Sequence, residues 1–277
     1  MDHIRQAIER AKAPGAPDTL LQQQNGSPIL QNSQVARAGT AGEPKSAGKA
    51  ITLDGARLED NRIISHDIAN PLSRSFDMLR TQVLQTMDMN SWPLLGVTSP
   101  TPGCGKSVIS INLALSIARQ QERSVLLVDF DLQKPQIANH LGLKCDQGVM
   151  SVLEGRTDLS SAIIQARIRN QQFLVLPCET ATPNSSEWMA SRQMSALMEE
   201  IKQQFKSWTV ILDLPPILTS DDVISILPQI NSVLFVVAAG STTASEIKEC
   251  NKHLEATPVV RVVLNKAEDA MPSYYHY

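Results

Sequence analysis

The hydrophobic positions of this chain fall into short continuous runs rather than into strict alternation with polar residues. Runs rich in Val, Ile and Leu occupy residues 94–98, 124–129, 172–176, 209–213, 232–238 and 259–265. Such a run is typical of a strand whose two faces are both covered, because neither face then meets water. We therefore predict strands of a mostly parallel sheet at these positions.

Helical patterns separate several of these runs. They cover residues 106–120, 186–205, 221–227 and 243–254. Strands that alternate with helices fold into a mostly parallel sheet with helices on both faces, so the predicted fold class is α/β. Ligands of such folds bind at the carboxyl ends of the strands. The functional residues are therefore expected directly after the apolar runs.

The two ends of the chain differ from this regular centre. Residues 1–13 can form a short amphipathic helix. Gly, Pro, Gln, Asn, Ser and Ala dominate from residue 14 to about residue 50, and we assign residues 14–60 to a flexible linker. One domain is then expected at 61–270, followed by a tail at 271–277.

Composition excludes several classes of function. The formal net charge is −3 and no dense basic run is present, which argues against nucleic-acid binding. The four cysteines stand far apart and make no metal-binding spacing with the histidines. The first 13 residues lack the apolar stretch of a signal peptide, so none is expected, and no segment approaches the about 20 apolar residues of a membrane-spanning helix. We expect a cytoplasmic protein that meets the inner face of the cell membrane only through a partner.

The loop after the first apolar run carries the strongest chemical signal. Residues 98–107 read TSPTPGCGKS, and a helical pattern follows. Glycines in a loop that opens a helix allow backbone N–H groups to surround phosphate oxygens. Lys106 is expected to reach the β- and γ-phosphates of a nucleotide, and Ser107 to bind magnesium. Pro100 replaces the usual first glycine of this P-loop motif, and a chance Gly-Lys-Ser at a helix start is the alternative.

Acidic residues follow two further runs. Asp129 and Asp131 alternate at the end of one run, and Asp213 ends another, before Leu-Pro-Pro. A carboxylate at such a strand end can hold a magnesium ion, directly or through water. Each could instead cap the next helix, which is common for Asp. Three acids at one sheet edge favour a shared role with the P-loop.

All three tyrosines of the chain lie in its last four residues, at Tyr274, Tyr275 and Tyr277. Tyrosine is otherwise a residue of sheets and cores. Its confinement to the terminus indicates a substrate segment, and the alternative is an accidental cluster in a frayed end.

Together these motifs resemble Walker A, Walker A′ and Walker B of the bacterial tyrosine autokinases that serve capsule and exopolysaccharide synthesis. The resemblance runs from about Asp67 to the C-terminus and includes residues 184–191. It implies a P-loop fold of the deviant Walker ATPase type, with ATP and Mg²⁺ as cofactors. It also implies phosphorylation of tail tyrosines in a neighbouring subunit, and activation by a membrane polysaccharide co-polymerase that regulates chain length.

The resemblance also assigns roles to residues. The catalytic set would be Lys106, Asp129, Asp131 and Asp213, with Asp129 and Asp131 helping to bind magnesium and to accept the tyrosine proton. Magnesium would be bound by Ser107, Asp129 and Asp213. ATP would be bound by Pro102, Gly103, Cys104, Gly105, Lys106, Ser107, Val108 and Asn265. Autophosphorylation would occur at Tyr274, Tyr275 and Tyr277.

Two places depart from the family pattern. Gln133, followed by Lys134, stands where Walker A′ usually has an arginine. In the helix at 70–80, Arg74, Asp77 and Arg80 occupy the positions of Glu, Arg and Arg in the family's oligomerisation motif. Assembly through this helix would then need an inverted acceptor surface, and the alternative is an ordinary solvated helix face.

Two other functions stay open at this point. A partitioning-type P-loop ATPase shares the fold and the strand-end acids, but such proteins carry a signature lysine where Thr101 stands, and they lack a tyrosine tail. A nucleotide-binding scaffold that regulates polysaccharide export without phosphotransfer would fit the altered Walker A′ segment.

Overall fold

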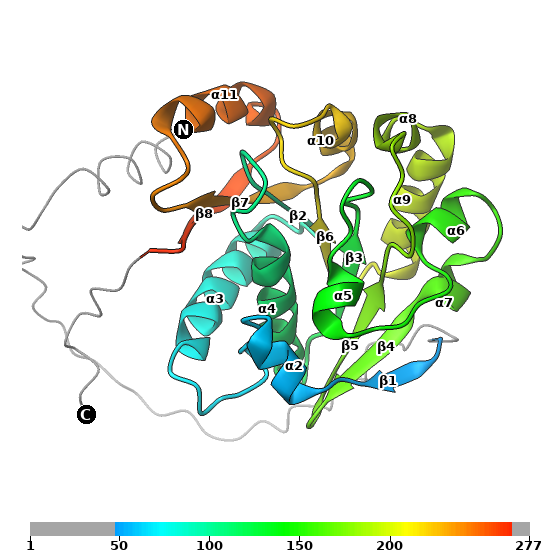
Figure 1. The fold of residues 1–277 in the computed structure, drawn as a ribbon, viewed down its shortest axis with the longest axis vertical. Helices are drawn as coiled ribbons and strands as arrows, with labels where there is room; N and C mark the ends of the chain where they lie inside the picture. The colour runs from blue at the N-terminus through cyan, green and yellow to red at the C-terminus, as the bar shows by residue number, and fades with distance from the viewer. Residues whose placement is uncertain (1–47, 268–277) are drawn as a thin grey trace, which may run out of the picture.

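The computed structural model describes residues 48–267. The predicted helix at 1–13, most of the predicted linker and the tyrosine-bearing tail lie outside the described residues. The described part is built on one sheet, with helices packed against both of its faces (Figure 1).

The sheet has eight strands in the order β1-β4-β5-β3-β6-β2-β7-β8. Their bounds are β1 Ala50–Thr52, β2 Leu94–Thr98, β3 Val125–Asp129, β4 Ile164–Ile168, β5 Gln171–Leu176, β6 Thr209–Asp213, β7 Ser232–Ala238 and β8 Val259–Asn265. Every neighbouring pair is parallel except β4 and β5, which form an antiparallel hairpin. The predicted α/β class with a mostly parallel sheet is confirmed.

The helices are α2 Gly55–Asp60, α3 Ser73–Met89, α4 Lys106–Ala118, α5 Ile137–Leu141, α6 Val149–Leu153, α7 Leu159–Ala162, α8 Ser185–Met189, α9 Arg192–Gln204, α10 Asp222–Ile226 and α11 Ala244–Leu254, with a 3₁₀ turn at Leu227–Gln229. Side chains of α2 to α5 pack into one hydrophobic core, and side chains of α6 to α11 into another, on the other face of the sheet. Strands β2, β3, β6 and β7 are buried along their whole length between these two layers.

The structure corrects two predictions from the sequence, the end of the linker and the extent of one helix. Residues 50–60 form β1 and α2 and so belong to the folded domain, whereas the linker was predicted to extend to residue 60. A strand of three residues and a helix of six are too short to show a hydrophobic period. The helix predicted at 186–205 is divided into α8 and α9, because Ser191 caps α9 by accepting a bond from the backbone N–H of Met194 at 3.0 Å.

The carboxyl ends of the central strands meet at one edge of the sheet. Asp129 at the end of β3 lies in register with Asp213 at the end of β6. Strand β2 lies next to β6 and leads directly into the loop before α4. This edge therefore gathers the segments in which the sequence placed the chemistry. Within residues 48–267, no helix is both long enough and apolar enough to span a lipid bilayer.

Candidate functional site

The loop between β2 and α4 is shaped by two glycines. Gly103 and Gly105 have φ values of +83° and +89°, in the left-handed region that glycine reaches without strain. A side chain on Gly105 would also collide with the amide nitrogen of Asn265. Because α4 begins at Lys106, its first backbone N–H groups lack helical acceptors and are available to an anion.

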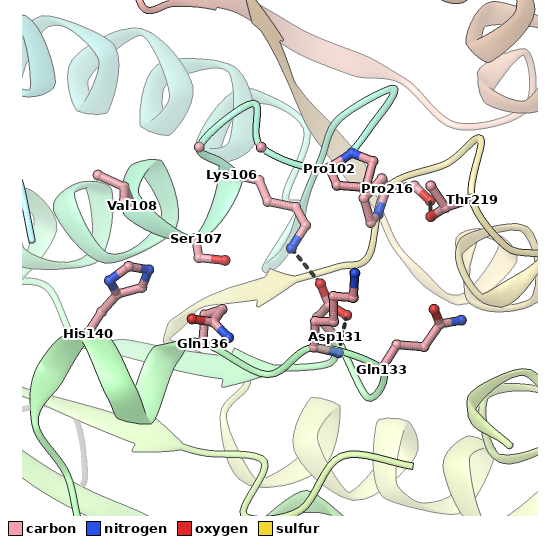
Figure 2. Close-up of a pocket in the computed structure, with 13 residues that line it drawn as sticks. Pro102, Lys106, Ser107, Val108, Asp131, Gln133, Gln136, His140, Pro216 and Thr219 are labelled. Carbon is pink, nitrogen blue, oxygen red and sulfur yellow. Dashed lines mark hydrogen bonds and ion pairs between the residues drawn. The ribbon is translucent and has the colours of Figure 1, made fainter. Parts of the chain in front are cut away.

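Lys106 and Asp131 form a buried ion pair across this loop. Lys106 Nζ lies 2.6 Å from Asp131 Oδ2, and the two side chains point toward each other in Figure 2. Burial by itself would lower the pKa of Lys106, but the carboxylates of Asp213, Asp131 and Asp129 raise it above its usual value. Lys106 is therefore held as an ammonium group at the entry of the helix.

Ser107 is oriented by the Walker B acid at the end of β6. Its hydroxyl donates to Asp213 Oδ2 at 2.6 Å, and the hydroxyl of Ser110 donates to Asp213 Oδ1 at 3.0 Å. Burial raises the pKa of Asp213, while Lys106 opposes that shift. Asp213 thus fixes the position of the hydroxyl that the sequence assigns to magnesium.

Asp129 is fully buried and supports the backbone of the next loop. Oδ1 accepts from the N–H of Asp131, and Oδ2 accepts from the N–H groups of Gln136 and Ile137 at 3.1 and 3.0 Å. Burial and the nearby Asp213 raise the pKa of Asp129 well above its usual value. These contacts place Asp131 and the first turn of α5 at the edge of the sheet.

A cavity of about 330 Å³ opens in front of these groups (Figure 2). It is lined by Pro102, Gly103, Gly105, Lys106, Ser107, Val108, Asp131, Gln133, Lys134, Gln136, His140, Pro216 and Thr219. Among the residues assigned to ATP, magnesium or catalysis, Cys104, Asp129, Asp213 and Asn265 lie outside this lining. The structure therefore divides the expected site into groups that face the cavity and groups that support them.

Asn265 is one of the supporting groups. Its Nδ2 donates to the carbonyl oxygen of Cys104 at 2.8 Å and so links the end of β8 to the P-loop. The thiol of Cys104 lies between the hydroxyls of Thr101 and Thr242, at 3.8 and 3.7 Å. The contact between Asn265 and adenine that the resemblance implied stays a prediction.

Four residues of the cavity wall were not expected. Gln136, which directly precedes α5, and His140, near the end of α5, stand four positions apart, and Pro216 and Thr219 follow β6. The spacing of Gln136 and His140 was a usable signal, since residues four apart share one helix face. The short helix itself was not predicted, so this face was not recognised.

Comparison with known proteins places the chain in a family. Residues 96–256, more than half of the chain, match the model of the family described as AAA domain. The chain belongs to this AAA domain family. The matched region contains the P-loop and all three strand-end acids, so the AAA domain includes the groups described above.

Relatives of this AAA domain protein are named tyrosine-protein kinases. EpsB of Ralstonia nicotianae is 31% identical over 209 residues, which cover 75% of this chain but only 27% of EpsB. The chain therefore spans about a quarter of the length of that relative. YwqD of Bacillus subtilis is 27% identical, with 80% of this chain and 93% of YwqD covered.

Solved structures agree with the fold and with the resemblance. The crystal structure of the chimerical protein CapA2B2 superimposes with a TM-score of 0.67 at 27% identity, covering 80% of this chain and 95% of that chain. The septum site-determining protein MinD from Pyrococcus horikoshii, solved with Mg-ADP, superimposes with a TM-score of 0.52 at 19% identity, covering 63% of this chain and 71% of that chain. The second likeness concerns the fold alone. The resemblance to the bacterial tyrosine kinases is confirmed, and the fold is that of nucleotide-binding P-loop proteins.

The AAA domain departs from the kinase pattern at Gln133. Its Nε2 donates to Ser185 Oγ at 2.9 Å and to Asp222 Oδ2 at 3.4 Å, so the side chain bonds to α8 and α10. Lys134 also lines the cavity, and its backbone N–H donates to Asp131 Oδ1 at 3.0 Å. The amide of Gln133 therefore anchors the loop, and a lysine brings positive charge next to the cavity.

The charged positions of α3 contact the body of the domain. Asp77 accepts from Arg119 Nη2 at 2.7 Å, from Ser116 Oγ at 2.6 Å and from Arg80 Nη1 at 3.2 Å. Arg74 is exposed. Two of the three residues at the oligomerisation positions are thus bonded within the chain. The alternative of an ordinary solvated helix face is therefore wrong for Asp77 and Arg80.

Proposed function

We propose that this chain is an ATP-dependent protein-tyrosine autokinase that phosphorylates Tyr274, Tyr275 and Tyr277. The observation that carries the proposal is the pairing of Lys106 with Asp131 beside the pairing of Ser107 with Asp213, at one wall of the 330 Å³ cavity. Phosphoryl transfer needs a cation on the phosphate, a positioned metal and a carboxylate near the nucleophile, and these pairs supply the residues for it.

The residues fit a magnesium ion that is bound together with a nucleotide. Within residues 48–267, no three Asp, Glu, His or Cys side chains converge as a complete metal site. Magnesium commonly takes only one or two protein oxygens and completes its shell with water and substrate phosphates. Ser107 would hold the ion, with Asp213 and Asp129 behind it, and the ion would neutralise charge on the phosphates. Burial raises the pKa values of Asp129 and Asp213, and a bound divalent cation would favour the charged forms of both carboxyl groups.

The resemblance to the kinases favours tyrosine transfer over a partitioning ATPase. Asn265 ends β8 next to the P-loop, and Tyr274 follows nine residues later. Nine residues span at most about 30 Å, which reaches this chain's own cavity or that of a neighbour. We assign the substrate tail to a neighbouring subunit, by analogy with the bacterial tyrosine kinases.

The biological role that follows is regulation of exopolysaccharide or capsule polymerisation and export. A membrane polysaccharide co-polymerase would activate the kinase and recruit it to the inner face of the membrane. Purified full-length protein mixed with vesicles carrying such a co-polymerase should autophosphorylate faster than protein mixed with empty vesicles.

The test of the kinase proposal is direct mapping of phosphate on the full chain. Incubation with magnesium and ATP should place phosphate on tyrosine, and a variant with Tyr274→Phe, Tyr275→Phe and Tyr277→Phe should bind ATP but carry no phosphotyrosine. Label on serine or threonine in that variant would indicate another activity. Nucleotide binding without any phosphotyrosine in the unaltered protein would favour the scaffold function.

Transfer between subunits has its own test. A Lys106→Ala chain with an intact tail is mixed with an active chain that lacks residues 271–277. Labelling of the Lys106→Ala chain supports transfer between subunits. Its absence at high concentration, together with concentration-independent labelling of the unaltered protein, would show transfer within one chain.

A further inference from the structure

The loop between β3 and α5, residues 130–136, carries a second lysine of the cavity wall. Lys134 lines the cavity together with Lys106, although none of the predicted roles uses it. Lys134 is exposed, and within residues 48–267 its ammonium group belongs to no ion pair. Its positive charge is therefore available to a molecule in the cavity.

One carboxylate connects the two lysines. Asp131 Oδ1 accepts from the backbone N–H of Lys134 at 3.0 Å, and Asp131 Oδ2 accepts from Lys106 Nζ at 2.6 Å. Figure 2 shows the side chains of Lys106 and Asp131 directed at each other. A lysine side chain is a flexible four-carbon stem. From a backbone bonded to Asp131, the ammonium group of Lys134 can thus reach the space in front of Lys106, where the phosphates are expected.

The backbone on both sides of Lys134 is fixed by the rest of the domain. Before it, the side chain of Gln133 donates to Ser185 Oγ on α8 at 2.9 Å. After it, the backbone N–H of Gln136 donates to the buried carboxylate of Asp129 at 3.1 Å. Lys134 is therefore a flexible side chain on a fixed base next to the cavity.

Gln133 itself brings no charge to the nucleotide. It stands where the family pattern has an arginine, but its amide is bonded to Ser185 and to Asp222. In Figure 2 its side chain extends away from Lys106. The positive charge of this loop is thus present one residue later, at Lys134.

The other ionisable groups of the cavity wall leave Lys134 as its net positive charge. Lys106 and Asp131 form an ion pair, so their charges offset each other. Burial lowers the pKa of His140, so that ring is neutral at neutral pH. A nucleoside triphosphate stays anionic when magnesium is bound, and its transfer reaction is accelerated by a further cation on the transferring group. Lys134 is the residue of the wall that can supply this cation.

We propose that the ammonium group of Lys134 contacts the γ-phosphoryl group of the bound nucleotide and stabilises the charge that develops during transfer. The proposal rests on the kinase function proposed above. In that transfer the phenolic oxygen bonds to the γ-phosphorus, and the bond to the β–γ bridging oxygen breaks with its electron pair on ADP. The tyrosine proton goes to a carboxylate after β3, as the resemblance implies. Lys134 keeps its protons throughout.

The first test varies the charge at position 134. Lys134→Ala and Lys134→Gln should form phosphotyrosine at least about tenfold more slowly at saturating magnesium-ATP, because a group that stabilises transition-state charge contributes up to about 10² to 10³ in rate. Lys134→Arg keeps the charge and should retain more of the rate than either. Lys144→Ala is the matched control, since Lys144 is exposed in the loop after α5 and lies outside the cavity lining. It should react at the unaltered rate.

The second test locates the contact on the nucleotide. Magnesium-ADP lacks the γ-phosphate, so its affinity for Lys134→Ala should equal that for the unaltered protein. A magnesium-bound, non-hydrolysable ATP analogue has this phosphate, and its affinity should fall by roughly threefold or more, as expected for an ion pair open to water. Calorimetric titration of the full chain measures both affinities.

The third test moves the charge by one residue. Gln133→Arg is added to Lys134→Ala. Because the side chain at position 133 points to α8 and α10, the new guanidinium group should meet the carboxylate of Asp222. The double variant should therefore stay as slow as Lys134→Ala. Recovery of the rate would show that any cation on this loop serves, and it would overturn the assignment to Lys134.

The outcomes separate this inference from the kinase proposal. An unaltered rate in Lys134→Ala, or a Lys134→Arg variant no faster than Lys134→Ala, overturns the role of Lys134 and leaves the kinase proposal standing. Equal losses of affinity for ADP and for the ATP analogue assign Lys134 to the support of the loop and also overturn the inference. An unaltered protein that forms no phosphotyrosine overturns the kinase proposal, while the two affinities still decide whether Lys134 contacts the γ-phosphate.

Discussion

Helix α4 carries an ion pair near each end, one buried and one part-buried, and the two pairs differ in the balance of charge. Near its first turn, Lys106 stands among Asp129, Asp131 and Asp213, next to the cavity. Near its last turn, a single carboxylate, that of Asp77 on α3, is bonded to two arginines and a serine. In the first group three carboxyl groups face one ammonium group, and burial disfavours the charged forms of two of them, whereas the second group is satisfied within the chain.

This difference distinguishes a ligand-binding site, around Lys106, from a structural contact, around Asp77. Buried charge that is left unbalanced next to open space destabilises the protein until a ligand neutralises it, and such groups cluster where function lies. Part-buried charge that is paired within the chain, as at Asp77, fixes the packing of α3 on α4. The predictions below test this comparison, from the largest expected effect to the smallest.

Lys106→Ala should have the largest effect, because it removes the cation from the wall where the phosphates are expected. The rate of phosphotyrosine formation should fall by about 10²-fold or more, as is found when a group that stabilises transition-state charge is removed. The chain should still fold, because the cavity lets water reach Asp131. Quantitative phosphotyrosine detection and far-ultraviolet circular dichroism measure the two effects. Lys202→Ala, on the exposed face of α9, is the control, and an active Lys106→Ala protein would remove the basis of the kinase proposal.

Asp213→Asn should lower the magnesium-dependent rate by roughly 10- to 100-fold, because it weakens the group that orients Ser107. The metal-free protein should lose no stability, since burial already disfavours the charged form of Asp213. Titration of the rate with magnesium and unfolding in urea without magnesium measure these two results. Unchanged magnesium dependence would make Asp213 a structural residue like Asp77.

The pH dependence of the free energy of unfolding should differ between the unaltered protein and Asp213→Asn. The folded-state pKa values of Asp129 and Asp213 are raised, so the folded protein binds more protons than the unfolded chain above pH of about 4. The free energy of unfolding of the metal-free protein should therefore fall as pH rises from about 4 through the raised pKa values. Asp213→Asn removes one of the two groups and should flatten that decline. Urea unfolding between pH 5 and 8 measures the slope, and a stability that increases over this range would contradict the assignment.

Asp77→Ala should leave the nucleotide site intact and destabilise the fold. It removes the carboxylate between Arg80 and Arg119, which then lack their partner in a part-buried place. The expected loss is about 2 kcal/mol in the free energy of unfolding, below the range for fully buried pairs because Asp77 keeps some exposure to water. Urea unfolding measures the loss, and nucleotide affinity serves as the internal control.

Arg74→Ala should have the smallest effect on stability, within about 0.5 kcal/mol, because Arg74 is exposed. It lies on the same helix as Asp77, so the two variants form a matched pair. Sedimentation of both variants shows whether this face also mediates self-association. A loss of stability in Arg74→Ala equal to that in Asp77→Ala would show that the distinction between the two positions is wrong.

The sequence was most informative where apolar runs were long. The strands predicted at 94–98, 209–213, 232–238 and 259–265 have the observed bounds, because residues buried on both faces leave a continuous pattern. The elements β1, β4 and α2 gave no such pattern, because each alternates buried with exposed or half-buried residues or is very short. Half-exposed strands and helices of one or two turns are defined by their partners in space, not by a local period.

The sequence alone determined the α/β class, the loop around Lys106 and the acids at the strand ends, since strand order along the chain and strand-end chemistry are both local properties. Only the tertiary structure decided which of these groups face the cavity and which support it. It also decided that Asp77 bonds inward to Arg119, and that Asn61, directly after α2, bonds to His140. These contacts join residues 42 to 79 positions apart, and the direction of a side chain across such a separation depends on how the helices pack.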